Sequence, residues 1–175
     1  LEDGSTHSIE TDSGEQTSIA GDFVNAIKDH TEADPAGLLI SFLVFAGNVI
    51  GRRRFVSIGA TKHYPNLFCL LVGPTSAGRK GTAISEVKTF FKGTFAMWAE
   101  DCLRSGLSSG EGVIHDLRDA EPDQDDLQHA KRVILERPPI EDRRRLYEEP
   151  EFGRLLSKNQ AKGSILSPVL RSAWD

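Results

Sequence analysis

The residue types best suited to chemistry lie close together in a glycine-rich stretch between residues 73 and 82. A phosphate-binding loop needs glycines that let backbone N–H groups turn towards an anion, a lysine that neutralises the outer phosphates, and a Ser or Thr hydroxyl that holds Mg²⁺. All of these types are present, and we assign phosphate binding to Gly73, Thr75, Ser76, Gly78, Arg79, Lys80, Gly81 and Thr82.

The spacing within this stretch departs from the standard pattern, in which the lysine directly follows the second glycine. Arg79 takes that place, and Gly81 separates Lys80 from Thr82. Two interpretations follow. Either the backbone amides of residues 74–81 surround phosphates while Lys80 and Arg79 neutralise charge, or the stretch is an ordinary strand-to-helix junction whose glycines permit tight packing. The second interpretation does not easily explain two cations at the junction.

A second group of chemical interest is an acidic segment near residue 150. Glu148, Glu149 and Glu151 follow a short predicted strand, and carboxylates at a strand end hold Mg²⁺ and orient water in many phosphoryl-transfer sites. Strand alternation would turn Glu148 to the opposite face from its neighbour. The alternative is a charged loop in which these carboxylates pair with the adjacent arginines, residues 143–145.

The elements that must position these groups follow from hydrophobic spacing and turn residues. The run of six apolar residues at 67–72 predicts a strand buried on both faces, and the helix at 36–49 is apolar nearly all round, which predicts burial. A Ser109 N-cap begins a further helix. In all, we expect helices at 21–33, 36–49, 81–91, 95–103, 111–118 and 152–157 and after Gly163, with strands at 55–58, 67–72 and 143–148. This order predicts an α/β sandwich.

Charge is segregated along the chain, whose formal net charge is −5. Residues 1–34 hold nine acidic residues against one lysine, and residues 51–104 hold nine basic residues against three acidic ones. The basic middle is suited to phosphates of a nucleotide or a nucleic acid, or forms a solvated surface. We divide the chain into an acidic tail or linker at 1–20, a helical segment packed on the core at 21–54, and the core at 55–175 with an acidic insertion at 119–142.

The sequence indicates a cytoplasmic protein with no membrane partner. The N-terminus has no signal-peptide pattern, and the longest apolar run, 37–50, is short for a membrane span. Five histidines and two cysteines are too scattered for a zinc site.

Several short motifs in one order resemble a bacterial P-loop NTPase family of plasmids and prophages, whose members accompany bifunctional primase/polymerases. The family's loop carries the same Arg-Lys-Gly-Thr ending. The resemblance covers roughly residues 36–175 and rests on 47–52, 66–68, 71–73, 79–82, 106–112, 149–155 and 166–175.

The resemblance implies a RecA/AAA-like three-layer P-loop NTPase core, with the chain ending inside that core. It implies a helicase-like ATPase in DNA replication of a mobile element, with ATP and Mg²⁺ as cofactors. Lys80, Glu149 and Glu151 would be catalytic: Thr82 and Glu149 would hold Mg²⁺, and Glu151 would polarise water. Expected partners are single-stranded DNA, a primase or other replication proteins, and further copies of the chain in a ring.

Two other functions remain open on the sequence. The first is a nucleic-acid-binding or primase/helicase-docking module with a degenerate loop that hydrolyses nothing. The second is a small-molecule kinase, which the Lys80-Gly81-Thr82 ending suggests.

Overall fold

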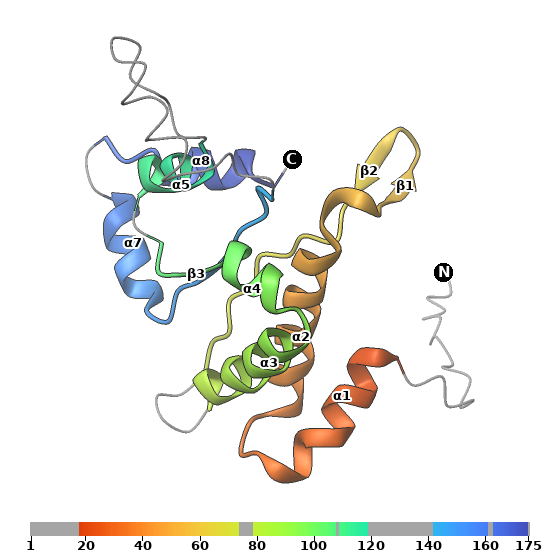
Figure 1. Cartoon of the computed structure of the whole chain (residues 1–175). Helices are drawn as coiled ribbons and strands as arrows, with labels where there is room; N and C mark the ends of the chain where they lie inside the picture. Colours follow the sequence, from red (N-terminus) through yellow and green to blue (C-terminus); the bar gives the residue numbers. More distant parts are fainter. Residues whose placement is uncertain (1–17, 74–78, 108, 119–141, 161–162, 175) are drawn as a thin grey trace, which may run out of the picture.

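Four helices pack together at one end of this protein, whose computed structural model describes residues 18–73, 79–107, 109–118, 142–160 and 163–174 (Figure 1). Their buried side chains form a hydrophobic cluster in which the rings of Phe42, Phe45, Phe91 and Trp98 contact one another. The helices are α1 (Ile19–Ile27), α2 (Pro35–Ile50), α3 (Lys80–Thr94) and α4 (Ala96–Cys102), with 3₁₀ turns η1 (Lys28–His30) and η2 (Gly51–Arg53).

The starts of α1 and α2 are set by local capping chemistry. Ser18 Oγ accepts a hydrogen bond from the Gly21 amide, and Asp34 Oδ1 accepts from the amides of Ala36 and Gly37. Pro35 occupies the first turn of α2, where its missing N–H costs nothing. The residue read as an interruption therefore begins the second helix.

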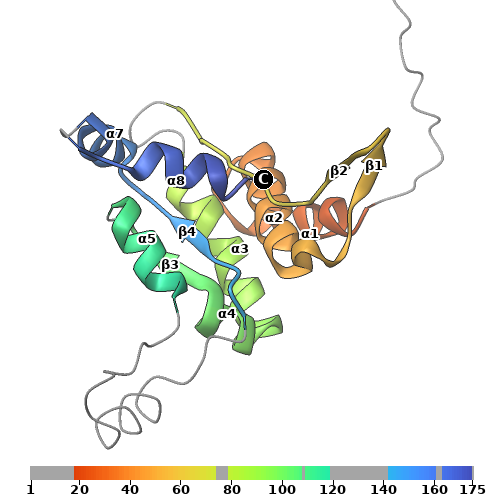
Figure 2. The same cartoon turned by 90° about the horizontal axis from the view of Figure 1, so that it is seen from above.

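A β-hairpin follows α2 and projects away from the four helices in both views (Figures 1 and 2). Strands β1 (Val56–Ile58) and β2 (Thr61–His63) pair antiparallel, with Val56 opposite His63. The sequence predicts β1 but gave no sign of β2 as its partner.

Two further strands pair in parallel between the helix groups. They are β3 (Leu103–Ser105) and β4 (Leu146–Glu148), with Leu103 opposite Leu146. Beyond them lie α5 (Gly110–Leu117), α7 (Phe152–Gln160) and α8 (Leu166–Ser172), which surround a smaller cluster formed by Leu107, Val113 and Leu166.

Alternation along β4 connects the two clusters. Leu146 packs against the four-helix cluster, and its neighbour Tyr147 packs against the smaller one. Helices therefore cover both faces of the β3–β4 pair, as Figure 2 shows from above. The fold is a mixed α/β arrangement, which agrees with the coarse class that the sequence predicts.

A polar joint ties β4 to the end of α2. The guanidinium of Arg144 donates to the carbonyl oxygens of Asn48 and Val49, and it also pairs with Asp142. The side chain of Asn48 donates to the Arg145 carbonyl and accepts from the Trp98 indole, at 2.9 and 3.0 Å. These bonds satisfy carbonyl groups that a helix C-terminus leaves without partners.

The prediction of a buried strand at 67–72 is wrong. In the structure this segment is extended but belongs to neither sheet among the described residues. Leu67, Phe68, Leu70 and Val72 are exposed, Val72 to 84%. Burial on both faces requires neighbouring strands on each side, and the described pairs are β1–β2 and β3–β4.

The prediction that α2 is buried all round is wrong on one side. Leu38, Phe42 and Phe45 are buried, whereas the stripe of Leu39, Ile40 and Leu43 is exposed. By length and composition alone, the helical stretch Pro35–Arg53 is also sufficient to cross a membrane, contrary to the expectation from residues 37–50. Core helices of soluble proteins pass the same test.

The other predicted helices are present with shifted ends. Those at 81–91, 95–103, 111–118 and 152–157 correspond to α3, α4, α5 and α7, and the one after Gly163 corresponds to α8. The tail at 1–17 and the predicted helix in the 119–142 insertion lie outside the described residues, apart from Asp142.

Candidate phosphate-binding site

The two ends of the glycine-rich loop meet through one hydrogen bond. Lys80 Nζ donates to the Gly73 carbonyl at 2.7 Å, so the amine lies across the base of the loop. Thr75, Ser76 and Gly78 lie outside the described residues. The lysine predicted to neutralise phosphates is therefore held at the loop, at the first residue of α3.

Arg79 joins the loop to α3 in a conformation that is unusual for its residue type. Its φ of 39° places it in the left-handed region, and no other non-glycine residue with positive φ occurs among the described residues. Such strain is found disproportionately at ligand-binding turns. Its guanidinium pairs with Glu32 at 2.7 Å, and both side chains are well exposed, so the ion pair itself stabilises little.

Packing against α2 fixes the position of α3. Ala83, Val87 and Phe91 form its buried side, and a Cβ placed on Gly37 of α2 would lie 3.3 Å from that of Ala83. Thr82 is half-buried beside this contact, while Gly81 has open space around it. The first turn of α3 is thus anchored on one side and accessible on the other.

The acidic segment lies at the carboxyl end of β4. Glu148 pairs with Lys88 of α3 at 2.6 Å, and its carbonyl accepts from the Gly106 amide at 2.7 Å. Glu149 accepts from the Leu107 amide with one oxygen and from the Glu151 amide with the other, each at 3.1 Å. Glu149 thus closes the turns after both parallel strands.

The structure does not bring the predicted catalytic residues into direct contact. Glu149 bonds to residues 107 and 151, and Lys80 to Gly73. Lys88 lies about 12 Å along α3 from Lys80 at 1.5 Å per residue. The Lys88–Glu148 pair therefore joins β4 to α3 two turns away from the loop. Glu151 is exposed, with Arg154 at 4.0 Å.

A buried charge network that the sequence did not indicate lies beside this segment. Asp116 accepts hydrogen bonds from Tyr147 at 2.8 Å, Arg145 at 3.3 Å and Arg104 at 3.5 Å. Burial alone would raise the pKa of Asp116, but the Tyr147 hydroxyl and the two guanidinium groups outweigh it and lower that pKa. Burial and the Asp116 carboxylate raise the pKa of Tyr147.

This network is structural, because it ties α5 to both parallel strands. Arg145 is almost fully buried in it, with 5% of its side chain exposed. It answers the alternative raised by the sequence, since Arg144 and Arg145 pair with Asp142 and Asp116 rather than with Glu148 or Glu149. The only sequence sign was that Asp116 follows Val113 by one helical turn, on the inner face of α5.

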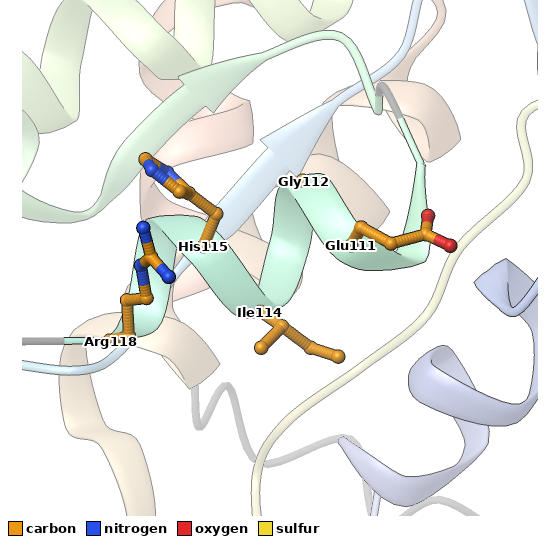
Figure 3. Close-up of a pocket in the computed structure, with 5 residues that line it drawn as sticks. All are labelled: Glu111, Gly112, Ile114, His115 and Arg118. Carbon is orange, nitrogen blue, oxygen red and sulfur yellow. The ribbon is translucent and has the colours of Figure 1, made fainter.

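A shallow hollow lies on the outer face of α5 (Figure 3). Its lining comes from α5 and the residue that follows it: Glu111, Gly112, Ile114, His115 and Arg118. His115 and Arg118 lie at one end and Glu111 at the other. Ser109 caps this helix by accepting from the Gly112 amide at 3.0 Å, so the sequence signal at 109–111 is explained by capping. Ser108 lies outside the described residues.

Within the described ranges, no group of three His, Cys, Asp or Glu side chains is placed to hold a metal ion. Thr82 and Glu149, the predicted magnesium ligands, do not contact each other, since both Glu149 oxygens accept backbone amides. Arg171 is exposed. Comparison with family models, curated proteins and solved structures found no match for this chain.

Proposed function

We propose that this chain is a P-loop-type nucleotide-binding domain that binds Mg²⁺–ATP at residues 73–82 and acts as a helicase-like ATPase. The observation that carries the proposal is the hydrogen bond of Lys80 to Gly73, which holds an ammonium group across a glycine-rich loop at the start of a 15-residue helix. Backbone amides, a helix N-terminus and a lysine at one loop form an anion site.

The surroundings of the loop support this proposal. Arg79 adds a second cation in a strained backbone conformation, and the first turn of α3 is open around Gly81. The parallel β3–β4 pair, with helices on both faces, is compatible with the three-layer sandwich of P-loop enzymes. Carboxylates follow the carboxyl end of β4, the edge at which parallel sheets bind ligands.

In the proposed complex Lys80 exchanges the Gly73 carbonyl for a phosphate oxygen, which costs little because one hydrogen bond replaces another. The residues described do not form a ready magnesium site, and the ion would arrive coordinated by ATP. Thr82 would supply a hydroxyl, while Glu149 would first have to leave the Leu107 amide. Glu151, which is exposed, would orient water only after that rearrangement.

The partners proposed for such an ATPase follow from the resemblance and the charge pattern. They are single-stranded DNA, a primase or other replication proteins of a mobile element, and further copies of the chain in a ring. The proposed location is the cytoplasm.

Calorimetric titration with Mg²⁺–ATP tests the binding step on the wild type, Lys80→Ala and Lys92→Ala. Lys92 is the matched control, because it is an exposed lysine on the same helix, about three turns from the loop. We expect micromolar binding that Lys80→Ala abolishes and Lys92→Ala retains. Equal losses in the two variants would attribute the effect to helix charge and count against a phosphate site at the loop.

A second candidate function is favoured by Glu149. Both oxygens of its carboxylate already accept backbone amides, which suits a module that binds nucleotide or nucleic acid without hydrolysis. Phosphate release with single-stranded DNA present separates the two functions. Turnover that Glu149→Gln abolishes supports the ATPase, whereas Lys80-dependent binding without turnover supports the module.

A further inference from the structure

The hairpin Gly51–Tyr64 has no counterpart in the proposed nucleotide site and lies apart from both hydrophobic clusters. Every residue from 52 to 63 is exposed, and Val56 and Ile58 are 65% and 67% exposed. An isolated two-stranded hairpin is marginally stable in water. A hairpin that buries neither face in its own chain is therefore suited to gain stability from a partner.

The charge of the hairpin restricts the kind of partner. No acidic residue occurs between residues 35 and 85, so the surroundings of the hairpin are uniformly cationic. Arg53 and Arg54 have no carboxylate partner among the described residues. The partner that matches this charge is a polyanion.

One face of the hairpin alternates cations with aromatic rings. The register places Ser57 opposite Lys62, and the same face carries Phe55 and Tyr64, whose ring centroids are 5.9 Å apart. Lys62 Nζ lies 4.4 Å from the Phe55 centroid, and the Arg52 guanidinium lies 3.9 Å from the Tyr64 centroid. Cations held on ring faces keep their positions at a low entropic cost.

We infer that this hairpin is a binding surface for single-stranded nucleic acid, with phosphates on the residue 52–54 and Lys62 cations and a base stacked on Phe55. Single-strand binders combine a basic track with exposed aromatic rings, because every base offers a face for stacking. Unstacked bases distinguish a single strand from a duplex or a phosphate-rich lipid surface as the ligand for Phe55. The inference deepens the proposed function, on which the choice of DNA rests, by naming the surface that holds the strand.

Fluorescence anisotropy with an oligothymidine of about 20 nucleotides tests the inference, since one fold of this type covers roughly 4–16 nucleotides. The variants are Arg53→Glu/Arg54→Glu, Phe55→Ala and the charge-matched control Lys28→Glu/Lys92→Glu, whose lysines are exposed on the helical group. Thermal unfolding of each variant checks that the fold persists.

We expect the Kd to rise about tenfold or more for Phe55→Ala, as for loss of one stacked base, and further for the double arginine variant. The salt dependence of log Kd should fall by roughly 1.4 in the double arginine variant, at about 0.7 for each lost phosphate contact on a single strand. The control should bind within about threefold of the wild type.

Two results would overturn the inference. One is wild-type affinity in the arginine and phenylalanine variants. The other is hairpin-dependent binding to phosphatidylserine-containing vesicles without oligothymidine binding, which would make the exposed Val56 and Ile58 a membrane contact. Calorimetry with Mg²⁺–ATP on the same proteins keeps the proposals separate. Hairpin-dependent DNA binding without ATP binding removes the nucleotide site alone, and the reverse result removes the hairpin alone.

Discussion

Replacement of Asp142 by asparagine should destabilise the fold by removing one charge from the joint between α2 and β4. Hydrogen bonds from Arg144 lower the pKa of Asp142 from 3.8 to about 2, despite the opposing effect of burial. The Asp142 side chain is 28% exposed. A shift of this size corresponds to about 2 kcal/mol of stability at neutral pH, at about 1.4 kcal/mol for each pKa unit.

The sign of the pH dependence follows from the lowered pKa. The stabilisation by the Asp142 carboxylate is complete above pH 3.8 and is lost as the pH falls through about 2. Roughly half of it should remain near pH 3. The difference in unfolding free energy between wild type and Asp142→Asn should therefore shrink from about 2 to about 1 kcal/mol between pH 7 and pH 3.

Urea unfolding followed by circular dichroism at these two pH values measures the difference. Asp101→Asn is the matched control, because it removes the same charge from an exposed residue next to Cys102. It should change the unfolding free energy by less than about 0.5 kcal/mol. Equal stability of Asp142→Asn and wild type at pH 7, or a difference that grows towards pH 3, would refute the proposed role of the joint.

Two further predictions concern packing and the exposed segment. Gly47→Ala should destabilise by roughly 1–3 kcal/mol or more, because its Cβ would lie 2.0 Å from the Pro65 carbonyl oxygen; Gly93→Ala, with open space around it, should be neutral or slightly stabilising, and equal melting temperatures for the two variants would contradict the close approach. In a thiol-reagent assay at pH 8, Cys69 should react quickly and Cys102 only after unfolding, since Cys102 is buried and burial with the nearby Asp142 charge raises its pKa to about 11. The fast phase should vanish in Cys69→Ser, and protection of both thiols would restore the buried strand at 67–72 that the sequence predicts.

The sequence predicts local features of this fold more reliably than long-range ones. The apolar spacing of α3 and the cap at Ser109 depend on neighbouring residues, and both are confirmed. The pairing of Leu103 with Leu146 joins segments on either side of the acidic insertion, and nothing local to either segment indicates it. The run at 67–72 was misread because continuous hydrophobicity predicts burial only if neighbouring strands exist to supply it.

The candidate site divides in the same way. Loop composition predicts Lys80 at the base of a glycine-rich turn, and the bond to Gly73 agrees with that position. The role of Glu149 depends on the distant Leu107 amide, and the network around Asp116 depends on three elements meeting. Such contacts are tertiary, so residue type alone could not distinguish a metal ligand from a carboxylate that caps backbone amides.

The central claim is that the 73–82 loop recognises phosphates, and comparison of Mg²⁺–ATP with AMP as ligands of the wild-type chain tests it most directly. Calorimetry should give micromolar binding of ATP and at least about tenfold weaker binding of AMP, because Lys80 and the loop amides contact the outer phosphates. Equal affinity for the two nucleotides, or binding of neither, would contradict a phosphate site at this loop.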